Sequence, residues 1–389
     1  MNGRLSFNKD GKFIILQVSD AQDLQFARPA MKKMLDIAYD EVKPDLVVLT
    51  GDNILGNHLC DARFGSRKVI KTKEGEYEAM KKAVAHVVEP IEKRGIPFAM
   101  IYGNHDDRNM ITKEEQADIY RAYPHNVGLD DPKEGIDCDT YNIPIYASDS
   151  DKIKYNIWMF DSAGYDKQSD KCYEYVSKNA VDWYVKKSDE LKELNGGKAV
   201  DSLLFQHVPF PETARLVVEC DENDPDVIPF CGNTRDGRRF KVDRTKVHHG
   251  VMGEYPACCE ENFGQFDAIK KQGDVRAAVF GHDHLNNFEA VLDGIDIIGT
   301  PCASFRCYGD RNRGVRVFII DENDTSKYET YVLTYKALCG DGLGAQIRYI
   351  WDADGMFKSK CALIAGASAA VISAGLLTAC IIKKRREKR

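Results

Sequence analysis

Residues 98–107 read FAMIYGNHDD, an apolar run that passes directly into glycine, asparagine, histidine and aspartate. The apolar part, Phe98 to Tyr102, is typical of a buried β-strand. The polar part offers amide, imidazole and carboxylate groups, all of which bind metal ions. This segment therefore indicates a strand whose carboxyl end carries chemistry.

Strands of the same kind are predicted on both sides of this segment. Before Gly281 they cover residues 13–18, 46–50, 157–160, 203–206 and 277–280. Apolar residues at three- and four-residue spacing predict helices between several of them, over 29–41, 76–93 and 180–194. After Gly281 come strands without helices, over 288–292, 295–298, 316–320 and 328–334. Alternating strands and helices favour an α/β sheet with helices on its faces, and the later strands indicate a second sheet packed on the first.

Polar residues with metal-binding groups follow five of these strands. They are Asp20 and Gln22, Asp52, Asn104 and His105, His207, and His282 and His284. Open α/β sheets bind ligands at the carboxyl ends of their strands. Oxygen and nitrogen donors of these types suit Mn²⁺, Fe, Zn²⁺ or Mg²⁺, and a pair of ions needs a bridging carboxylate. Glycines before Asp52, Asn104 and His282 allow tight turns and a close approach of the backbone.

This order of motifs (GD, GNHD, a lone histidine, then GHDH) resembles the calcineurin-like metallophosphoesterases over residues 12–335. The wider context, including GDVRAAVFGHDHLNN at 273–287, is similar to the compact, purple-acid-phosphatase-like branch. The resemblance implies a four-layer fold, classed as α/β (α+β), in which a central two-sheet β-sandwich is flanked by helices. It also implies a dinuclear metal site at one edge of the sandwich.

The resemblance further implies a role for each residue at the strand ends. Asp20 and His284 would bind the first metal, Asp52 would bridge both, and the second would be bound by Asn104, His207 and His282. His105 would protonate the leaving oxygen or stabilise the transition state, so His105 and Asp52 are the predicted catalytic residues. The two divalent ions would activate a hydroxide that attacks phosphorus in line.

Two positions depart from the family pattern. Gln22 stands where the first motif has a histidine, and its amide oxygen is a weaker ligand for iron or zinc than imidazole. The first site would then favour Mn²⁺ or Mg²⁺, bind loosely or recruit Asp23, and Gln22 is a possible ligand. Leu55 replaces the metal-binding tyrosine of purple acid phosphatases, which predicts no iron–tyrosinate colour. Asp106 and Asp283 are predicted to orient the adjacent histidines instead of binding metal.

We therefore expect a hydrolase that acts on phosphomonoesters, with phosphodiester or nucleotide hydrolysis as the alternative. A catalytically weak, membrane-tethered binding protein stays open, because Gln22 removes one metal ligand. The expected substrate is a phosphorylated small molecule or protein; the oligomeric state stays open. The net charge of −7 becomes −12 without the basic final seven residues, which argues against nucleic-acid binding. Arg306, Arg311 and Arg313 are interpreted as surface charge, with phosphate binding as the alternative.

The carboxyl-terminal region predicts a membrane anchor. Residues 361–382, CALIAGASAAVISAGLLTACII, run for 22 residues without a charge, and about 20 apolar residues cross a bilayer. We expect a metallophosphoesterase domain over 1–340, a juxtamembrane spacer over 341–360, a transmembrane helix over 361–382 and a basic tail over 383–389. Since no signal peptide is recognised, the expected location is the membrane, with the catalytic domain on the cytoplasmic side; the basic tail favours the opposite orientation.

Overall fold

The computed structural model describes residues 4–60, 69–106, 108–129, 135–162, 164, 173–230, 237–259 and 262–366. Its strands are β1 (Lys12–Val18), β2 (Leu46–Thr50), β3 (Phe98–Ile101), β4 (Tyr141–Tyr146), β5 (Ile153–Phe160), β6 (Ser202–Gln206), β7 (Val217–Cys220), β8 (Arg239–Val242), β9 (Val247–Met252), β10 (Val275–Phe280), β11 (Asn286–Leu292), β12 (Ile295–Gly299), β13 (Gly314–Asp321) and β14 (Asp324–Thr334). Its helices are α1 (Pro29–Val42), α2 (Lys73–Glu92), α3 (Lys113–Arg121), α4 (Lys178–Leu194), α5 (Gln265–Gln272), α6 (Tyr335–Cys339) and α7 (Leu343–Asp352), with 3₁₀ turns at Gly56–His58 and Pro211–Leu216.

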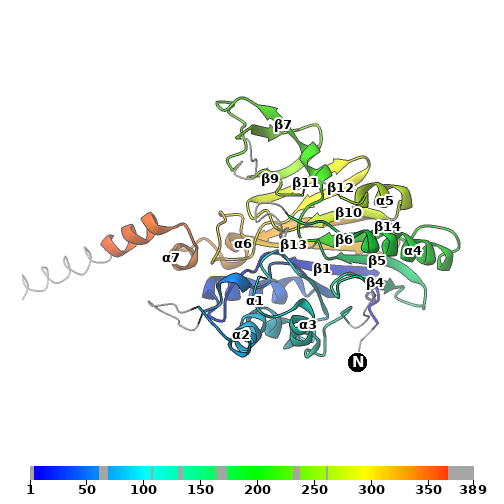
Figure 1. The fold of residues 1–389 in the computed structure, drawn as a ribbon, viewed down its shortest axis with the longest axis horizontal. Helices are drawn as coiled ribbons and strands as arrows, with labels where there is room; N and C mark the ends of the chain where they lie inside the picture. Colours follow the sequence, from blue (N-terminus) through cyan, green and yellow to red (C-terminus); the bar gives the residue numbers. More distant parts are fainter. Residues whose placement is uncertain are drawn as a thin grey trace, which may run out of the picture.

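Two large sheets form the centre of the fold (Figure 1). The first has the order β14-β13-β1-β2-β3, and the second has the order β4-β5-β6-β10-β12-β11-β9; β7 and β8 form a separate pair. β1, β2 and β3 run parallel, as do β5, β6, β10 and β12. Parallel neighbours end at the same edge, so each sheet brings several polar strand ends together.

The strand predictions hold, but the assignment of strands to sheets differs from the expectation. The late strands do not form a sheet of their own. β13 pairs with β1 and with β14 in the first sheet, whereas β11 and β12 extend the second sheet beside β10. Strands that were not predicted also occur, since β4 and β8 lie in segments where no strand was expected.

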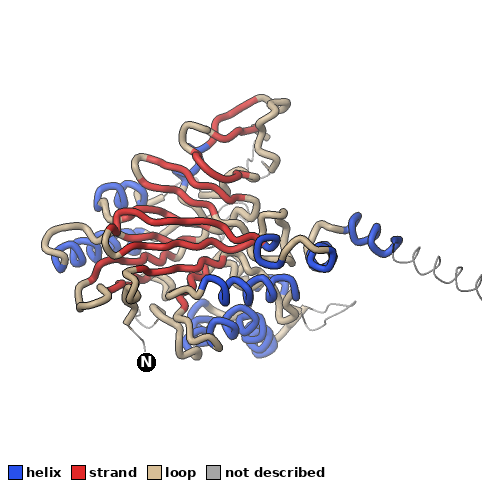
Figure 2. The backbone as a smooth tube through the Cα atoms, turned by 180° about the vertical axis from the view of Figure 1, so that it is seen from behind, coloured by secondary structure: helices blue, strands red, loops and turns tan. Residues whose placement is uncertain are grey.

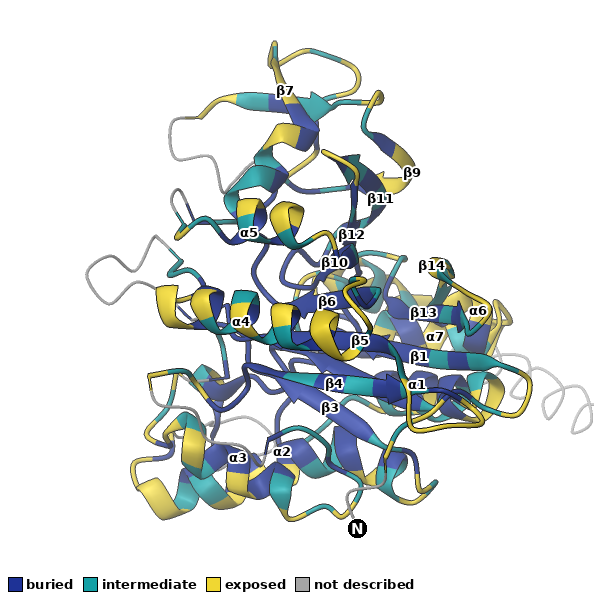
Figure 3. Ribbon diagram, turned by 90° about the vertical axis from the view of Figure 1, so that its right-hand side faces the viewer, coloured by how far each residue is buried: buried dark blue, intermediate teal, exposed yellow. Residues whose placement is uncertain are grey.

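Side chains alternate between the two faces of the second sheet. Ile157 and Met159 of β5 belong to the core between the sheets, where the Phe205 and Phe318 ring centroids lie 5.8 Å apart. Their neighbour Trp158 belongs to the core beneath α4 and α5. Figure 3 shows α4 with its exposed residues on the outer side. A strand buried on both faces is expected where helices and a second sheet cover it.

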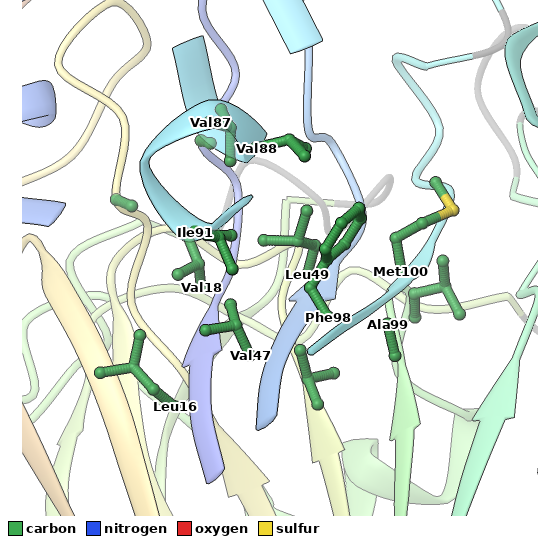
Figure 4. Packing of buried hydrophobic residues seen from close by; sticks show 14 of the residues in the cluster. Leu16, Val18, Val47, Leu49, Val87, Val88, Ile91, Phe98, Ala99 and Met100 are labelled. Atoms are coloured by element: carbon green, nitrogen blue, oxygen red, sulfur yellow. The ribbon is translucent and has the colours of Figure 1, made fainter. Parts of the chain in front are cut away.

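Helices α1, α2 and α3 cover the outer face of the first sheet (Figure 2). Val87, Val88 and Ile91 near the end of α2 lie over the apolar residues of β1, β2 and β3 (Figure 4). The order of layers is therefore helices, sheet, sheet, helices. The mixed α/β metallophosphoesterase fold predicted from the sequence agrees with this architecture.

The prediction of a transmembrane helix over 361–382 has to be corrected. Among the described residues, none of the helices is both long and apolar enough to cross a membrane, which overturns the single-pass anchor and the membrane location based on it. Of that span, 361–366 are helical, while 367–382 and the basic tail over 383–389 lie outside the described residues. The prediction rested on length and absence of charge alone, and a run rich in alanine and glycine can meet both criteria without being a membrane span.

The predicted spacer over 341–360 contains α7, which packs against the body of the protein. Tyr349 is buried, and its hydroxyl accepts a hydrogen bond from Arg313 Nη1 at 2.9 Å. Asp352 Oδ2 accepts a hydrogen bond from Ala30 N at 2.7 Å, at the start of α1. These contacts join α7 to the first helix layer.

Candidate metal centre

The carboxyl ends of strands from both sheets meet at one site. Asp20, Asp52 and Asn104 follow β1, β2 and β3 of the first sheet. His207 follows β6, and His282 and His284 follow β10 of the second sheet. All six residues are buried. Residues separated by up to 264 positions in sequence thus share one edge of the sandwich, as the strand ends predicted.

Within this site, two groups of side chains are close enough to hold a metal ion. One group is Asp52, His207 and His282, and the other is Asp20, Asp52 and His284. In each group the ligand atoms lie within 4.8 Å of one another, and Asp52 belongs to both. The Asn104 side chain adjoins the first group, with Oδ1 3.1 Å from His207 Nε2. The arrangement has the shared carboxylate that a pair of ions requires.

The hydrogen bonding of these groups fits bound cations. Among the described residues, Asp20 Oδ1 and His282 Nε2 are buried without a hydrogen-bond partner. Buried polar atoms normally find one, because leaving them unpaired costs about 1–3 kcal/mol. A carboxylate oxygen and an imidazole nitrogen that face the same site are donors that divalent metals accept. The residues present therefore fit the metal ions that the sequence implies.

The electrostatics of the cluster point the same way. Burial raises the pKa of Asp52, but the charges of His207 and His105 outweigh burial and hold that pKa below its usual range. Burial lowers the pKa of His207, and the carboxylates of Asp52 and Asp20 reverse this and raise it to about 9. Burial and the charge of His207 lower the pKa of His282 to about 3. A divalent cation bound here would compete with the proton on His207, because a histidine must be deprotonated to bind a metal.

Backbone geometry brings the site residues this close. Asp20, Asp52 and His282 have φ angles of 51°, 47° and 68°. Such left-handed conformations cost non-glycine residues about 1–3 kcal/mol and gather at functional sites. A Cβ atom on Gly103 would lie 2.3 Å from Asp52 N, so the turn after β3 requires a glycine. This agrees with the role predicted for the glycines that precede the motifs.

His105 lies at the edge of the cluster. Its backbone N donates to Asp52 Oδ1 at 2.8 Å, which ties its position to the shared carboxylate. Its ring Nδ1 is 3.0 Å from Oδ1 of Asn57. Asn57 lies in the 3₁₀ turn after β2, and no sequence motif marks it. The contact fixes the orientation of the imidazole.

Gln22 occupies the site, as its position in the first motif predicts. It is buried, and its Nε2 donates to Asp52 Oδ2 at 2.5 Å. Asp23, the suggested replacement ligand, is instead paired with Arg306 and accepts a hydrogen bond from Arg28 N at 2.6 Å. Asp23 is therefore committed to a structural ion pair, and Gln22 is the residue of the first motif that contacts the shared carboxylate.

Two further aspartates act on the backbone and not on the histidine rings. Asp106 accepts hydrogen bonds from the backbone N–H groups of Gly103, Asn53 and Ile54 at 2.8–3.2 Å. Asp283 accepts one from Ala257 N at 3.1 Å. These bonds hold loops in place, so the prediction that the two aspartates orient the adjacent histidine rings is wrong.

The arginines interpreted as surface charge are also largely structural. Arg313 is buried, and its guanidinium donates to Ser304 O at 2.6 Å and to Tyr349 Oη at 2.9 Å. Arg306 pairs with Asp23, and the Arg311 guanidinium lies 5.6 Å from the Tyr349 ring centroid. These contacts hold the loop after β12 to the body.

Two aromatic residues that no sequence motif marks contact histidines of the candidate metal centre. The Tyr308 ring stacks on His284 with centroids 4.2 Å apart, and its hydroxyl donates to Glu254 Oε2 at 3.0 Å. The Tyr173 ring meets His282 edge-on, with centroids 4.6 Å apart. Both tyrosines come from loops, where no period or motif marks them.

Comparisons with known proteins agree with this geometry. A sequence model of the family described as calcineurin-like phosphoesterase matches residues 13–286. The Arabidopsis thaliana protein named probable inactive purple acid phosphatase 29 is 24% identical over 83% of this chain and 80% of its own length. Phosphatase DCR2 of Saccharomyces cerevisiae is 23% identical over 87% of this chain and 55% of its own. A solved dimetal phosphatase from Danio rerio has 12% identity and a TM-score of 0.46, over 83% of this chain and 99% of its own.

Proposed function

Because this chain belongs to the calcineurin-like phosphoesterase family, we propose that it hydrolyses phosphate esters with the help of divalent metal ions, and that it prefers phosphomonoesters. The observation that carries this proposal is the pair of ligand groups that share Asp52. A single structural ion would need one closed set of ligands, whereas a shared carboxylate suits two ions side by side.

In this proposal, each strand end has one task. Asp20 and His284 would hold one ion, Asp52 would serve both, and Asn104, His207 and His282 would hold the other. Gln22 remains a possible ligand through its amide oxygen, since its Nε2 is used on Asp52. When bound, such ions supply positive charge that activates water and offsets the charge developing on phosphoryl oxygens. Mn²⁺, Fe, Zn²⁺ and Mg²⁺ all accept these donors.

His105 is the proposed proton donor. Asn57 Oδ1 accepts a hydrogen bond from ring atom Nδ1, so Nε2 gives a proton to the leaving oxygen of the substrate only from the imidazolium form of His105. Burial lowers the pKa of His105, and the charge of Asp52 favours the imidazolium form. Hydrolysis then breaks the bond between phosphorus and that oxygen, and releases an alcohol and inorganic phosphate. The backbone bond to Asp52 keeps this ring beside the ions during the reaction.

A second candidate function is a binding protein without turnover. Gln22 in place of a histidine favours it, and three Arabidopsis relatives carry names that include "probable inactive". His105 argues against it, because a binding protein gains nothing from a proton donor held against the shared carboxylate. Hydrolysis of phosphodiesters or nucleotides is the alternative within the enzyme class.

The decisive experiment begins with the full chain stripped of metal. Mn²⁺, Zn²⁺, Fe²⁺ and Mg²⁺ are added back in turn while hydrolysis of a chromogenic phosphomonoester and of its diester is followed. We expect metal-dependent turnover of the monoester that is lost in Asp52→Asn, together with bound metal. His105→Ala should lose turnover but retain metal. No turnover with any of these metals, in a chain that binds them, would favour the binding protein.

A further inference from the structure

A cavity of about 510 Å³ lies beside the metal centre. Tyr173 connects the two, because its ring lines the cavity and also meets the ring of His282 edge-on at 4.6 Å. Asp161, the residue that follows β5, also lines it, so the cavity opens at the same sheet edge as the metal ligands. Its volume is in the range of about 300–1,000 Å³ that small-molecule sites occupy.

The cavity wall is acidic. Asp137, Asp161 and Glu174 line it, and none of the described lining residues carries a positive charge. Lys113 lies behind the wall, with Nζ 2.6 Å from Asp161 and 3.1 Å from Asp137. Burial raises the pKa of Asp161 well above its usual range, and Lys113 offsets the charge of its pair with Asp137, so Glu174 is the carboxylate that makes this wall negative. An acidic wall repels a second phosphate and attracts a cation.

The wall is also aromatic. Tyr175 and Phe263 line the cavity with Tyr173, and the Tyr175 and Phe263 ring centroids are 5.1 Å apart. Phe263 is 51% exposed, so part of its ring is accessible to a ligand in the cavity. Aromatic faces beside carboxylates are the pattern that binds organic ammonium groups.

A metal ion is a poorer occupant than an organic cation. Among the described residues, side chains that could hold a metal converge within 4.8 Å at Asp52 and its neighbours, and the cavity carboxylates form no such group. The volume is also far larger than one ion requires. Rings that a cation can lie against, with carboxylates spread around them, suit a bulky and weakly hydrated charge.

We propose that this cavity binds the alcohol part of the substrate, and that this alcohol carries an organic ammonium group. The inference rests on the proposed function, since the phosphate would lie at the metal centre while the ammonium lies between Glu174 and Phe263. For phosphocholine, water adds its oxygen to phosphorus, the bond from phosphorus to the choline oxygen breaks, and that oxygen takes a proton. The products are inorganic phosphate and choline.

The test compares two esters of nearly identical shape. Phosphocholine and 3,3-dimethylbutyl phosphate differ in one atom, because a neutral carbon replaces the ammonium nitrogen. On the metal-loaded full chain, we expect kcat/KM to favour phosphocholine by at least about tenfold, since contacts of a cation with aromatic rings and carboxylates discriminate on that scale. A ratio close to one would overturn the inference and leave the proposed function intact.

Two variants separate the cavity from the rest of the protein. Glu174→Gln removes a charge, and Phe263→Leu removes an aromatic face but keeps an apolar side chain; each should lower the ratio severalfold. Glu193→Gln, which removes an exposed charge near the far end of α4, should leave the ratio unchanged. A ratio that survives both cavity variants would refute the assignment of this cavity.

Binding is measured separately, so that failed turnover is informative. If neither ester is hydrolysed with any metal, the proposed function fails, and calorimetry with choline then decides the inference. Choline binding in the millimolar range that Glu174→Gln weakens would support the cation site. A dissociation constant of about 10 mM corresponds to a binding free energy of about −3 kcal/mol, and the absence of binding at that choline concentration would refute the inference.

Discussion

Replacing Gly103 with alanine tests how closely two strands approach at the metal centre. A Cβ atom at this position would lie 2.3 Å from both the N and Oδ1 atoms of Asp52, and 2.7 Å from His207 Nε2. Cβ atoms essentially never come within 3.0 Å of such neighbours, so something must shift. Since the obstructing atoms belong to two residues of one ligand group, relieving the clash separates them.

The size of the effect follows from the surroundings. Overpacking a filled core costs about 1–3 kcal/mol, and here the neighbours are buried backbone and ring atoms that cannot rotate away. We therefore expect the free energy of unfolding of the metal-free protein to fall by about 3 kcal/mol, the upper end of that range. Metal affinity should fall by about 10- to 100-fold, as it does when groups supporting metal ligands are disturbed.

Urea unfolding and a competitive metal titration measure the two quantities. Gly344→Ala is the matched control, because a Cβ atom there has nothing within 4 Å. Gly344 lies in α7, so alanine should stabilise the protein by up to about 1 kcal/mol and leave metal affinity unchanged. A Gly103→Ala protein with wild-type stability and wild-type metal affinity would refute the close approach of β2 and β3 at this site.

Three further predictions concern stability. Arg306→Met should lower the free energy of unfolding in urea by about 3 kcal/mol, because it leaves buried Asp23 without its ion pair. If Arg306→Met lowers the free energy of unfolding by the same amount in an Asp23→Asn protein, the ion pair is not the cause. Burial raises the pKa of Asp139 to about 6, so its ionised form destabilises the fold. Asp139→Asn should therefore be more stable than wild type by up to about 3 kcal/mol at pH 8, and this gain should shrink between pH 6 and pH 4; a gain independent of pH would exclude the explanation. Finally, Mn²⁺ at about 100 times its dissociation constant should raise stability by about 2.7 kcal/mol, and Asp20→Asn should abolish the increase; a wild-type protein indifferent to metal would contradict the ligand assignment.

Much of the fold could be predicted because strands and helices leave a local signal. Short continuous apolar runs place β1, β2 and β6 almost to the residue. The assignment of strands to sheets could not be predicted in the same way. β13 pairs with β1 across about 300 residues of chain, and nothing local in either strand specifies that partner. The prediction of a transmembrane helix over 361–382 failed for a related reason, since it rested on composition alone.

The same distinction applies to the site. The residues of the two ligand groups could be predicted because each directly follows a strand that ends at the shared edge. Tyr308 and Asn57 could not, because they contact His284 and His105 from a loop and from the turn after β2. Glu254 could not either, since it acts through its hydrogen bond with Tyr308. Arg306 was misjudged as surface charge because its partner, Asp23, lies 283 positions away.

The division of the ligands between the two sheets has a consequence for biosynthesis. The first sheet supplies Asp20, Asp52 and Asn104 early in translation, whereas His282 and His284 follow β10 and leave the ribosome much later. A nascent chain that ends before β10 lacks one histidine from each ligand group. On the proposed ligand assignment, both complete ligand groups would form only after β10 has been synthesised, and bound ions would mark the molecules in which both sheets have met.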